Sequence, residues 1–224
     1  MTLRIPGAFL IPLLAVGGAH AGVADEPALR EVRVAPLPPE EWSPETRAKL
    51  EATVRRVAGL VEQAQAPAKP LPILTVIARH PTLLGPFLEF TGTLATRGVL
   101  SRRDSELLAL RTAWNCRSAF EWGHHVLYAR AAGISDAEIA RIAAREIGPE
   151  WSPRERSLLA AADELHARQR IADATWSALV RDFDEPQRIE IPFIVGQYTM
   201  LSMVAESLGV PVEPELPKLP AALP

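Results

Sequence analysis

The segment SRRDSELLALRTAWNCRSAFEWGHHVLYARAAG, from Ser101 to Gly133, decides the fold of this chain. It begins with Ser101 and Asp104, a hydroxyl and a carboxylate spaced as in a helix capping box. It ends at Gly133, a typical residue just after a helix. The run Glu106–Arg130 between these signals is the longest helical stretch that the sequence predicts.

Two positions inside this run favour a break. Asn115 and Ser118 are helix N-cap residue types, and Ser118 with Glu121 has the spacing of a capping box. The run is therefore either one helix or two helices that meet at an elbow.

The rest of the chain also has helical spacing of its apolar residues, with capping residues and prolines between the runs. The other expected helices span residues 44–61, 73–79, 136–145, 153–165, 175–182 and 187–208, and residues 83–96 are apolar enough to be largely buried. No sustained alternation of apolar and polar residues predicts a strand. The expected fold class is all-α, with about six to eight helices and antiparallel neighbours.

The ends of the chain differ from this helical part. Residues 1–21 resemble a secretory signal peptide with an A-x-A cleavage site at Ala19–Ala21, although the segment also fits a disordered leader or a misplaced start. If it is a signal peptide, the protein is exported or periplasmic; otherwise it is cytoplasmic. Residues 22–39 are expected to form an extended linker or arm, 40–210 the helical domain and 211–224 a proline-rich tail. The apolar run in the leader is too short to span a membrane.

The composition of the chain argues against several classes of function. The chain has 24 basic and 27 acidic residues, a net charge of −3, and no basic cluster, so no nucleic-acid partner is expected. Cys116 is the single cysteine, which excludes an internal disulfide and a cysteine-based zinc site. A small-molecule substrate remains as the expected partner.

Glu121 and His125 form the candidate catalytic centre. Their four-residue spacing places a carboxylate and an imidazole on one face of a helix, and Glu106 edges the same cleft if the helix is unbroken. Apolar neighbours such as Trp122 predict partial burial, which shifts pKa values toward the range useful for proton transfer. The alternative is that the pair only stabilises a helix.

A metal site is the other hypothesis for this segment, with His124, His125 and Glu121 as ligands and His80 as a further one. Adjacent histidines project about 100° apart on a helix, and the spacing differs from that of an HExxH motif. No metal ion is therefore expected.

Three stretches resemble the carboxymuconolactone decarboxylase family, which shares an all-helical fold with the AhpD-like alkylhydroperoxidases. They are PLPPEEWSPETRAKLE (36–51), RDSELLALRTAWNCRSAFEWGHHVLYARAAGISDAEIARI (103–142) and IVGQYTMLSMVAESLGV (194–210), and the resemblance covers most of the chain, from about residue 37 to residue 210. Where AhpD-like proteins have a glutamate, a CxxC pair and a histidine, this chain has Glu106, Ser118, Glu121 and His125. The dithiol is missing, so the resemblance is closer to the decarboxylase side of the family.

This resemblance implies a cofactor-independent lyase that acts on a small carboxylated lactone or a related acid. It also implies a homo-oligomer, a trimer or a multiple of one, with sites near the subunit contacts. The expected proton donor is His125, while Glu121 orients the imidazole and raises its pKa, and Glu106 relays a proton or supports the site. Arg111 is the expected ligand of a substrate carboxylate. Further expected substrate contacts come from His124, Trp122 and Tyr198, and Gln197 is a polar residue in the same apolar run as Tyr198.

Two alternative functions remain open from the sequence. One is an AhpD-like thiol-dependent peroxidase that uses Cys116. The other is a non-catalytic, small-molecule-binding oligomer in which the polar residues are structural.

Overall fold

Side-chain capping sets most of the helix starts. A serine or aspartate side chain lies directly before each of six helices and accepts a backbone N–H of the first turn, which satisfies a group that has no partner inside the helix. The six capping residues are Ser43, Ser101, Ser118, Ser135, Ser152 and Asp184.

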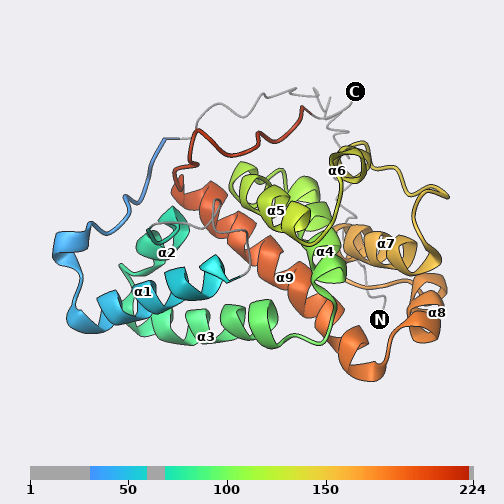
Figure 1. Ribbon diagram of the computed structural model, residues 1–224, viewed down its shortest axis with the longest axis horizontal. Helices are drawn as coiled ribbons and strands as arrows, with labels where there is room; N and C mark the ends of the chain where they lie inside the picture. Colours follow the sequence, from blue (N-terminus) through green and yellow to red (C-terminus); the bar gives the residue numbers. More distant parts are fainter. Residues whose placement is uncertain (1–30, 60–68, 222–224) are drawn as a thin grey trace, which may run out of the picture.

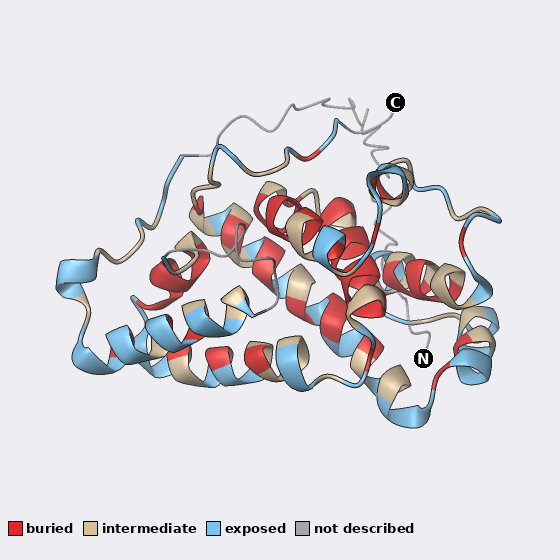
Figure 2. Cartoon of the chain, in the orientation of Figure 1, coloured by how far each residue is buried: buried red, intermediate tan, exposed pale blue. Residues whose placement is uncertain are grey.

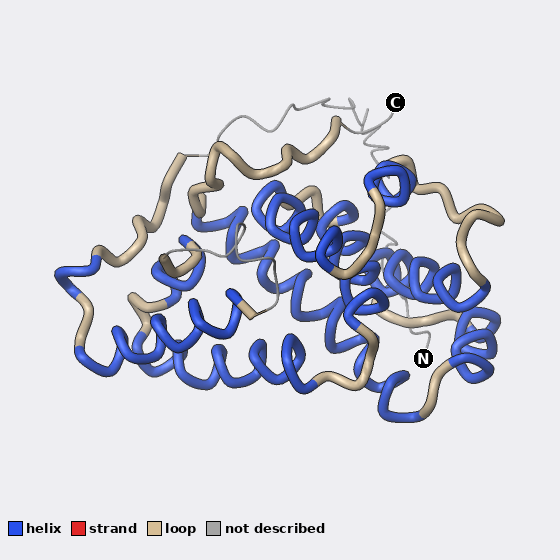
Figure 3. The backbone as a smooth tube through the Cα atoms, in the orientation of Figure 1, coloured by secondary structure: helices blue, strands red, loops and turns tan. Residues whose placement is uncertain are grey.

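The computed structural model describes residues 31–59 and 69–221, and these residues form helices and loops without a strand (Figure 3). A short 3-10 helix, Pro39–Glu41, comes first. The α-helices of this described part are α1 (Pro44–Ala58), α2 (Pro72–Ile77), α3 (Pro81–Arg97), α4 (Arg102–Asn115), α5 (Ala119–Ala131), α6 (Asp136–Ala143), α7 (Pro153–Arg168), α8 (Asp173–Asp182) and α9 (Glu185–Leu208). The all-α prediction is confirmed.

The elbow between α4 and α5 explains why the described helices outnumber the expected six to eight. Arg117 adopts a left-handed backbone conformation with φ 54°, which ends the α4 helical path. The Ser118 side chain then accepts the backbone N–H of Glu121 and starts α5. The longest helix is consequently α9, and the run Glu106–Arg130 is not one helix.

The longest helix, α9, crosses the molecule diagonally, and α4 packs against α5, α7 and α9 (Figure 1). The pair α1 and α3 lies side by side, α2 packs on α3, and α8 packs on α7. Every residue of α4 from Asp104 to Trp114 is buried, as expected of a helix surrounded by others. Figure 2 shows the buried residues concentrated on these inner helices, whereas α1 and α8 expose broad faces.

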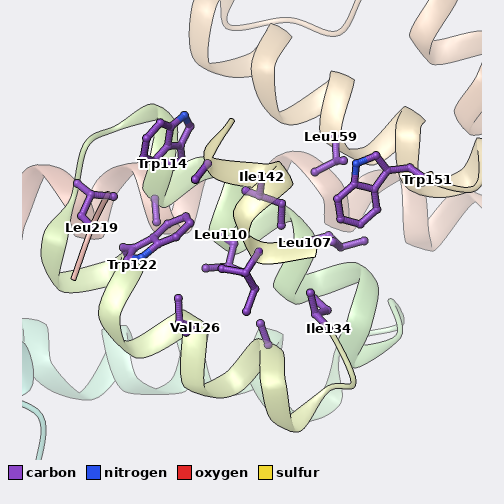
Figure 4. Close-up of a cluster of buried hydrophobic side chains, with 14 residues drawn as sticks. Leu107, Leu110, Trp114, Trp122, Val126, Ile134, Ile142, Trp151, Leu159 and Leu219 are labelled. Atoms are coloured by element: carbon purple, nitrogen blue, oxygen red, sulfur yellow. The ribbon is translucent and has the colours of Figure 1, made fainter. Parts of the chain in front are cut away.

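One of three apolar core clusters surrounds the elbow (Figure 4). In this cluster the rings of Trp114 and Trp122 lie 5.8 Å apart, and Leu219 from the C-terminal tail packs with them. The tail, residues 210–221, forms no helix and runs across α5. At Gly123 a β-carbon would lie only 3.0 Å from the Cβ of Leu216, so the glycine permits this close crossing. The tail therefore contributes to the core next to the elbow.

Residues 31–38 form a loop that contacts the end of α9. The backbone N–H groups of Arg33 and Val34 both donate to the carbonyl of Leu208 at the end of α9. The expected signal peptide, residues 1–21, lies outside the described residues, as does the first half of the arm expected at 22–39. Within the described ranges, no helix has the combined length and apolar character needed to cross a membrane.

Candidate active site

A cavity of about 110 Å³ lies between α1, α2, α3, α4, α5 and α9. Its apolar wall is built by aliphatic and phenyl side chains that include Leu71, Leu74, Phe87 and Leu201. Its ionisable lining side chains are Arg56, Arg102, Glu106, Glu121, His124, His125, Tyr128 and Tyr198. A polar centre within an apolar wall is the usual composition of a small-molecule site.

The centre of this site joins α4 to α5 through Glu106 and His125. The Nδ1 atom of His125 lies 2.7 Å from Oε2 of Glu106, and both residues are almost fully buried. The other carboxylate oxygen of Glu106 accepts a hydrogen bond from Nη2 of Arg102 at 2.5 Å. Glu106 is thus held on both oxygens, and its contact with Nδ1 fixes the orientation of the His125 imidazole.

Glu121 takes a different position from the one expected for it. Its Oε2 atom lies 3.6 Å from Nε2 of His125, beyond a good hydrogen bond, so Glu106 rather than Glu121 orients the imidazole. Its Oε1 atom is buried and has no hydrogen-bond partner. Burial raises the pKa of Glu121, and the charge of Glu106 adds to this, against the opposing effect of His125 and His124. The protonated form is therefore favoured, and it offers an O–H donor.

Two tyrosines enclose the imidazole of His125. The ring of Tyr198 lies 4.2 Å from it and the ring of Tyr128 5.3 Å, both edge to face. Burial raises the pKa of both phenols, and the nearby carboxylates of Glu106 and Glu121 raise it further. Both phenols are therefore neutral, and the expected placement of Tyr198 beside the pocket agrees with the structure.

His124 lies on the side of the cavity that faces the tail. Its Nδ1 atom is 2.9 Å from the carbonyl oxygen of Phe120, and its Nε2 atom is 3.6 Å from Oε1 of Glu213. Burial lowers the pKa of His124, but Glu213 and the Phe120 carbonyl outweigh burial and raise the pKa overall. The tail thus supplies a counter-charge for one wall of the site.

Arg111 and Trp122 do not line the cavity, contrary to their expected substrate contacts. The guanidinium of Arg111 is only 1% exposed and donates from Nε and Nη2 to Asp163, at 2.7 Å each, and from Nη1 to the carbonyl of Ile142. Trp122 packs in the apolar cluster around the elbow (Figure 4). With its donors committed to Asp163 and Ile142, Arg111 is a structural residue.

Cys116 and Gln197 also lie away from the cavity lining. The Sγ atom of Cys116 is 3.8 Å from Nδ1 of His166 and 3.9 Å from Oγ1 of Thr199. Burial raises the pKa of this thiol, which disfavours the reactive thiolate. Gln197 donates to the hydroxyl of Thr91.

Three ionisable lining residues were missed by the sequence-based reasoning, namely Arg56, Arg102 and Tyr128. Arg102 carried a usable signal, because it precedes Glu106 by four residues and so lies on the same helix face. Arg56 belongs to α1 and reaches the site only through the tertiary fold. In the described ranges 31–59 and 69–221, no group of three or more His, Cys, Asp or Glu side chains is placed to hold a metal ion.

Sequence comparison finds one family that part of the chain matches. The sequence pattern of the Carboxymuconolactone decarboxylase family matches residues 81–164, which include α4, α5 and the Glu106–His125 contact. No curated protein matches the sequence.

Solved structures share the fold at low sequence identity. An AhpD core structure, an uncharacterized peroxidase-related protein from Ralstonia eutropha JMP134, aligns with a TM-score of 0.68 at 16% identity, covering 83% of this chain and 95% of that one. The debrominase Bmp8 aligns with a TM-score of 0.67 at 14% identity, covering 82% and 94%. An Agrobacterium tumefaciens protein of unknown function, titled as a candidate antioxidant defence protein AhpD, aligns with a TM-score of 0.57 at 20% identity, covering 62% and 96%. The resemblance to an AhpD-like helical fold is thereby confirmed.

Proposed function

We propose that this protein is a cofactor-independent lyase that decarboxylates a small carboxylated lactone or a related acid, as the match of residues 81–164 to the Carboxymuconolactone decarboxylase family suggests. One observation carries the proposal. A buried Glu106–His125 pair lines an apolar-walled cavity, and Glu121, which has a buried carboxyl oxygen without a hydrogen-bond partner, lines the same cavity. This arrangement combines a proton donor with a hydrogen-bond donor inside a water-poor site.

In the proposed reaction the bond between the carboxylate carbon and the lactone ring breaks, and carbon dioxide leaves. The bonding electron pair passes into the conjugated lactone and forms an extended enolate. The Nε2–H of His125 then protonates the enolate at carbon, and the imidazole regains a proton from solvent. Glu106 accepts a hydrogen bond from Nδ1–H throughout and stabilises the imidazolium before the transfer.

The surroundings support two further steps of this reaction. The apolar wall disfavours a charged carboxylate, so contact with Leu74 and Phe87 favours its conversion into neutral carbon dioxide. The protonated Glu121 is placed to donate to the lactone carbonyl, where negative charge develops. This is a different role from the orientation of His125 first expected of Glu121.

Thiol chemistry has weaker support as an alternative. Cys116 does not line the cavity, the pKa of its thiol is raised, and the two positions that correspond to the AhpD-like cysteines hold Ser118 and Glu121. A non-catalytic binding function would leave the Glu106–His125 pair without a chemical role.

A homo-oligomer is part of the proposal. On α9 the large apolar side chains of Ile189, Phe193, Met200 and Met203 are exposed, by 54%, 52%, 41% and 63%. The ring of Phe90 from α3 lies 6.2 Å from that of Phe193 and extends the same surface. Exposed apolar side chains gathered in this way are typical of subunit contacts.

The deciding experiment measures carbon dioxide release from 4-carboxymuconolactone by the wild type, His125→Ala and Cys116→Ser. We expect release by the wild type and by Cys116→Ser, and loss of release in His125→Ala. Absence of carbon dioxide release by all three proteins would exclude 4-carboxymuconolactone as the substrate. Consumption of an organic hydroperoxide that is lost in Cys116→Ser would establish the thiol peroxidase instead. Ligand-dependent melting shifts without turnover would support the binding function.

A further inference from the structure

A second hollow adjoins the cavity. A groove of about 540 Å³ runs between α1 and α3, and its lining shares Thr53, Arg56 and Gly92 with the cavity. The two spaces therefore meet at Arg56, whose side chain borders both of them.

The groove is predominantly cationic. Lys49, Arg56 and Arg97 line it, and Glu89 is its one acidic lining residue. Lys49 is paired with Glu45 at 2.6 Å, a contact on the exposed face of α1. Among the described residues, no carboxylate forms an ion pair with Arg56 or Arg97, and Nη1 of Arg56 donates only to the backbone carbonyl of Leu88, at 3.3 Å.

Two glycines of α3 leave room for the cationic groups. A β-carbon at Gly92 would lie 2.0 Å from Nη1 of Arg56, and one at Gly85 would lie 3.0 Å from Nζ of Lys49. Both side chains consequently lie close against the backbone of α3, one at each end of the groove. A guanidinium held in this way presents its remaining N–H groups to a ligand.

We propose that this groove binds a second carboxylate of the substrate, at the end opposite to the reacting one. The substrate is then an elongated dicarboxylic acid, whose reacting end enters the cavity beside His125 while its distal carboxylate pairs with Arg56. Binding energy from the distal end holds the reacting carboxylate against the apolar wall. This inference rests on the proposed function for the reacting end, but the groove itself is defined independently of that reaction.

The test measures binding without turnover, by calorimetry with linear α,ω-dicarboxylates of six to twelve carbons and the matching monocarboxylates. At the chain length that spans the two spaces, we expect the diacid to bind about 10-fold more tightly than the monoacid, as is typical of one charge-assisted contact. In Arg56→Gln this gain should fall below about 2-fold. The neighbouring Arg55 is exposed and lines neither space, so Arg55→Gln is the matched control and should retain the gain.

Equal binding of diacid and monoacid at every length would overturn the proposal, as would a gain that survives Arg56→Gln. Failure of the proposed function is a separate outcome. If the diacid binds more tightly than the monoacid in a way that depends on Arg56, but no carbon dioxide is released, the lyase function is rejected and the carboxylate site in the groove is supported. If carbon dioxide release depends on His125, but the diacid binds no more tightly than the monoacid, the carboxylate site in the groove is rejected and the lyase function is supported.

Discussion

His125 on α5 and Glu106 on α4 contact each other at 2.7 Å across the elbow between their two helices. The contact exists because the chain turns at Arg117 and Ser118, so that α5 folds back along α4. Glu121, one turn before His125 on the same helix, is farther from the imidazole than Glu106 is. The elbow therefore determines which carboxylate contacts the imidazole of His125.

Replacement of Glu106 by Gln is expected to lower the rate of carbon dioxide release about 100-fold, within the usual range for loss of acid–base assistance. The amide keeps the size of the side chain but removes the charge that stabilises the imidazolium. Initial rates at saturating substrate measure the effect. His166 is exposed and lies outside the cavity, so His166→Gln provides a control that should retain the wild-type rate. An undiminished rate in Glu106→Gln would contradict the assigned role.

Glu121→Gln is expected to change how stability depends on pH. Folding raises the pKa of Glu121 above its ordinary 4.5, so the folded state holds this proton more tightly than the unfolded state does. The stability that Glu121 contributes is therefore lost as the pH rises from about 4.5 through the folded pKa. The variant does not titrate, so its Tm relative to the wild type should increase as the pH rises above about 4.5 and become constant above the folded pKa of Glu121. A Tm difference that shows no such increase would show that Glu121 is ionised in the folded protein.

Arg111→Met is expected to reduce the free energy of unfolding by about 3–5 kcal/mol, because it leaves Asp163 without its buried partner. Urea denaturation measures this loss. The affinity for substrate should stay unchanged at temperatures where the variant is folded, since Arg111 does not line the cavity. A raised KM with unchanged stability would restore Arg111 as the carboxylate ligand first expected from the sequence.

Phe193→Asp is expected to shift the protein from an oligomer toward a monomer, because it places a charge at the centre of the exposed apolar surface of α9. Light scattering coupled to size-exclusion chromatography measures the mass. Val180 on α8 has a similar exposure, 48% against 52% for Phe193, so Val180→Asp is the matched control and should leave the mass unchanged. A wild-type mass that corresponds to a monomer would contradict the proposed homo-oligomer.

Local signals in the sequence were sufficient to predict the helices. Capping residues such as Ser101 and Ser135 act on the N–H groups of their own first turn, so their effect can be read from a few neighbouring residues. The elbow was foreseen as one of two alternatives, because Ser118 has the same capping chemistry in the middle of an apolar run. A choice between one helix and two depends on tertiary packing, which the local pattern does not contain.

The site itself was only partly predictable for the same reason. Glu106, Glu121 and His125 were found because they lie within one segment, but their partners were assigned as if that segment were straight. Arg111 was misplaced because its partner, Asp163, lies 52 residues away along the chain. Arg56 comes from α1, and nothing in the residues around it distinguishes it from Arg55, which is also exposed but does not line the cavity.

The crossing of the tail over α5 has a consequence for biosynthesis. Glu213, which pairs with His124, and Leu219, which packs in the core around the elbow, both follow α9 in the chain. Since the ribosome produces the chain from its N-terminus, all the described helices are synthesised before these two residues emerge. In a nascent chain with residues 213–219 still in the exit tunnel, His124 therefore lacks its partner Glu213 and the core around the elbow lacks Leu219, and both contacts form only after this part of the chain has left the ribosome.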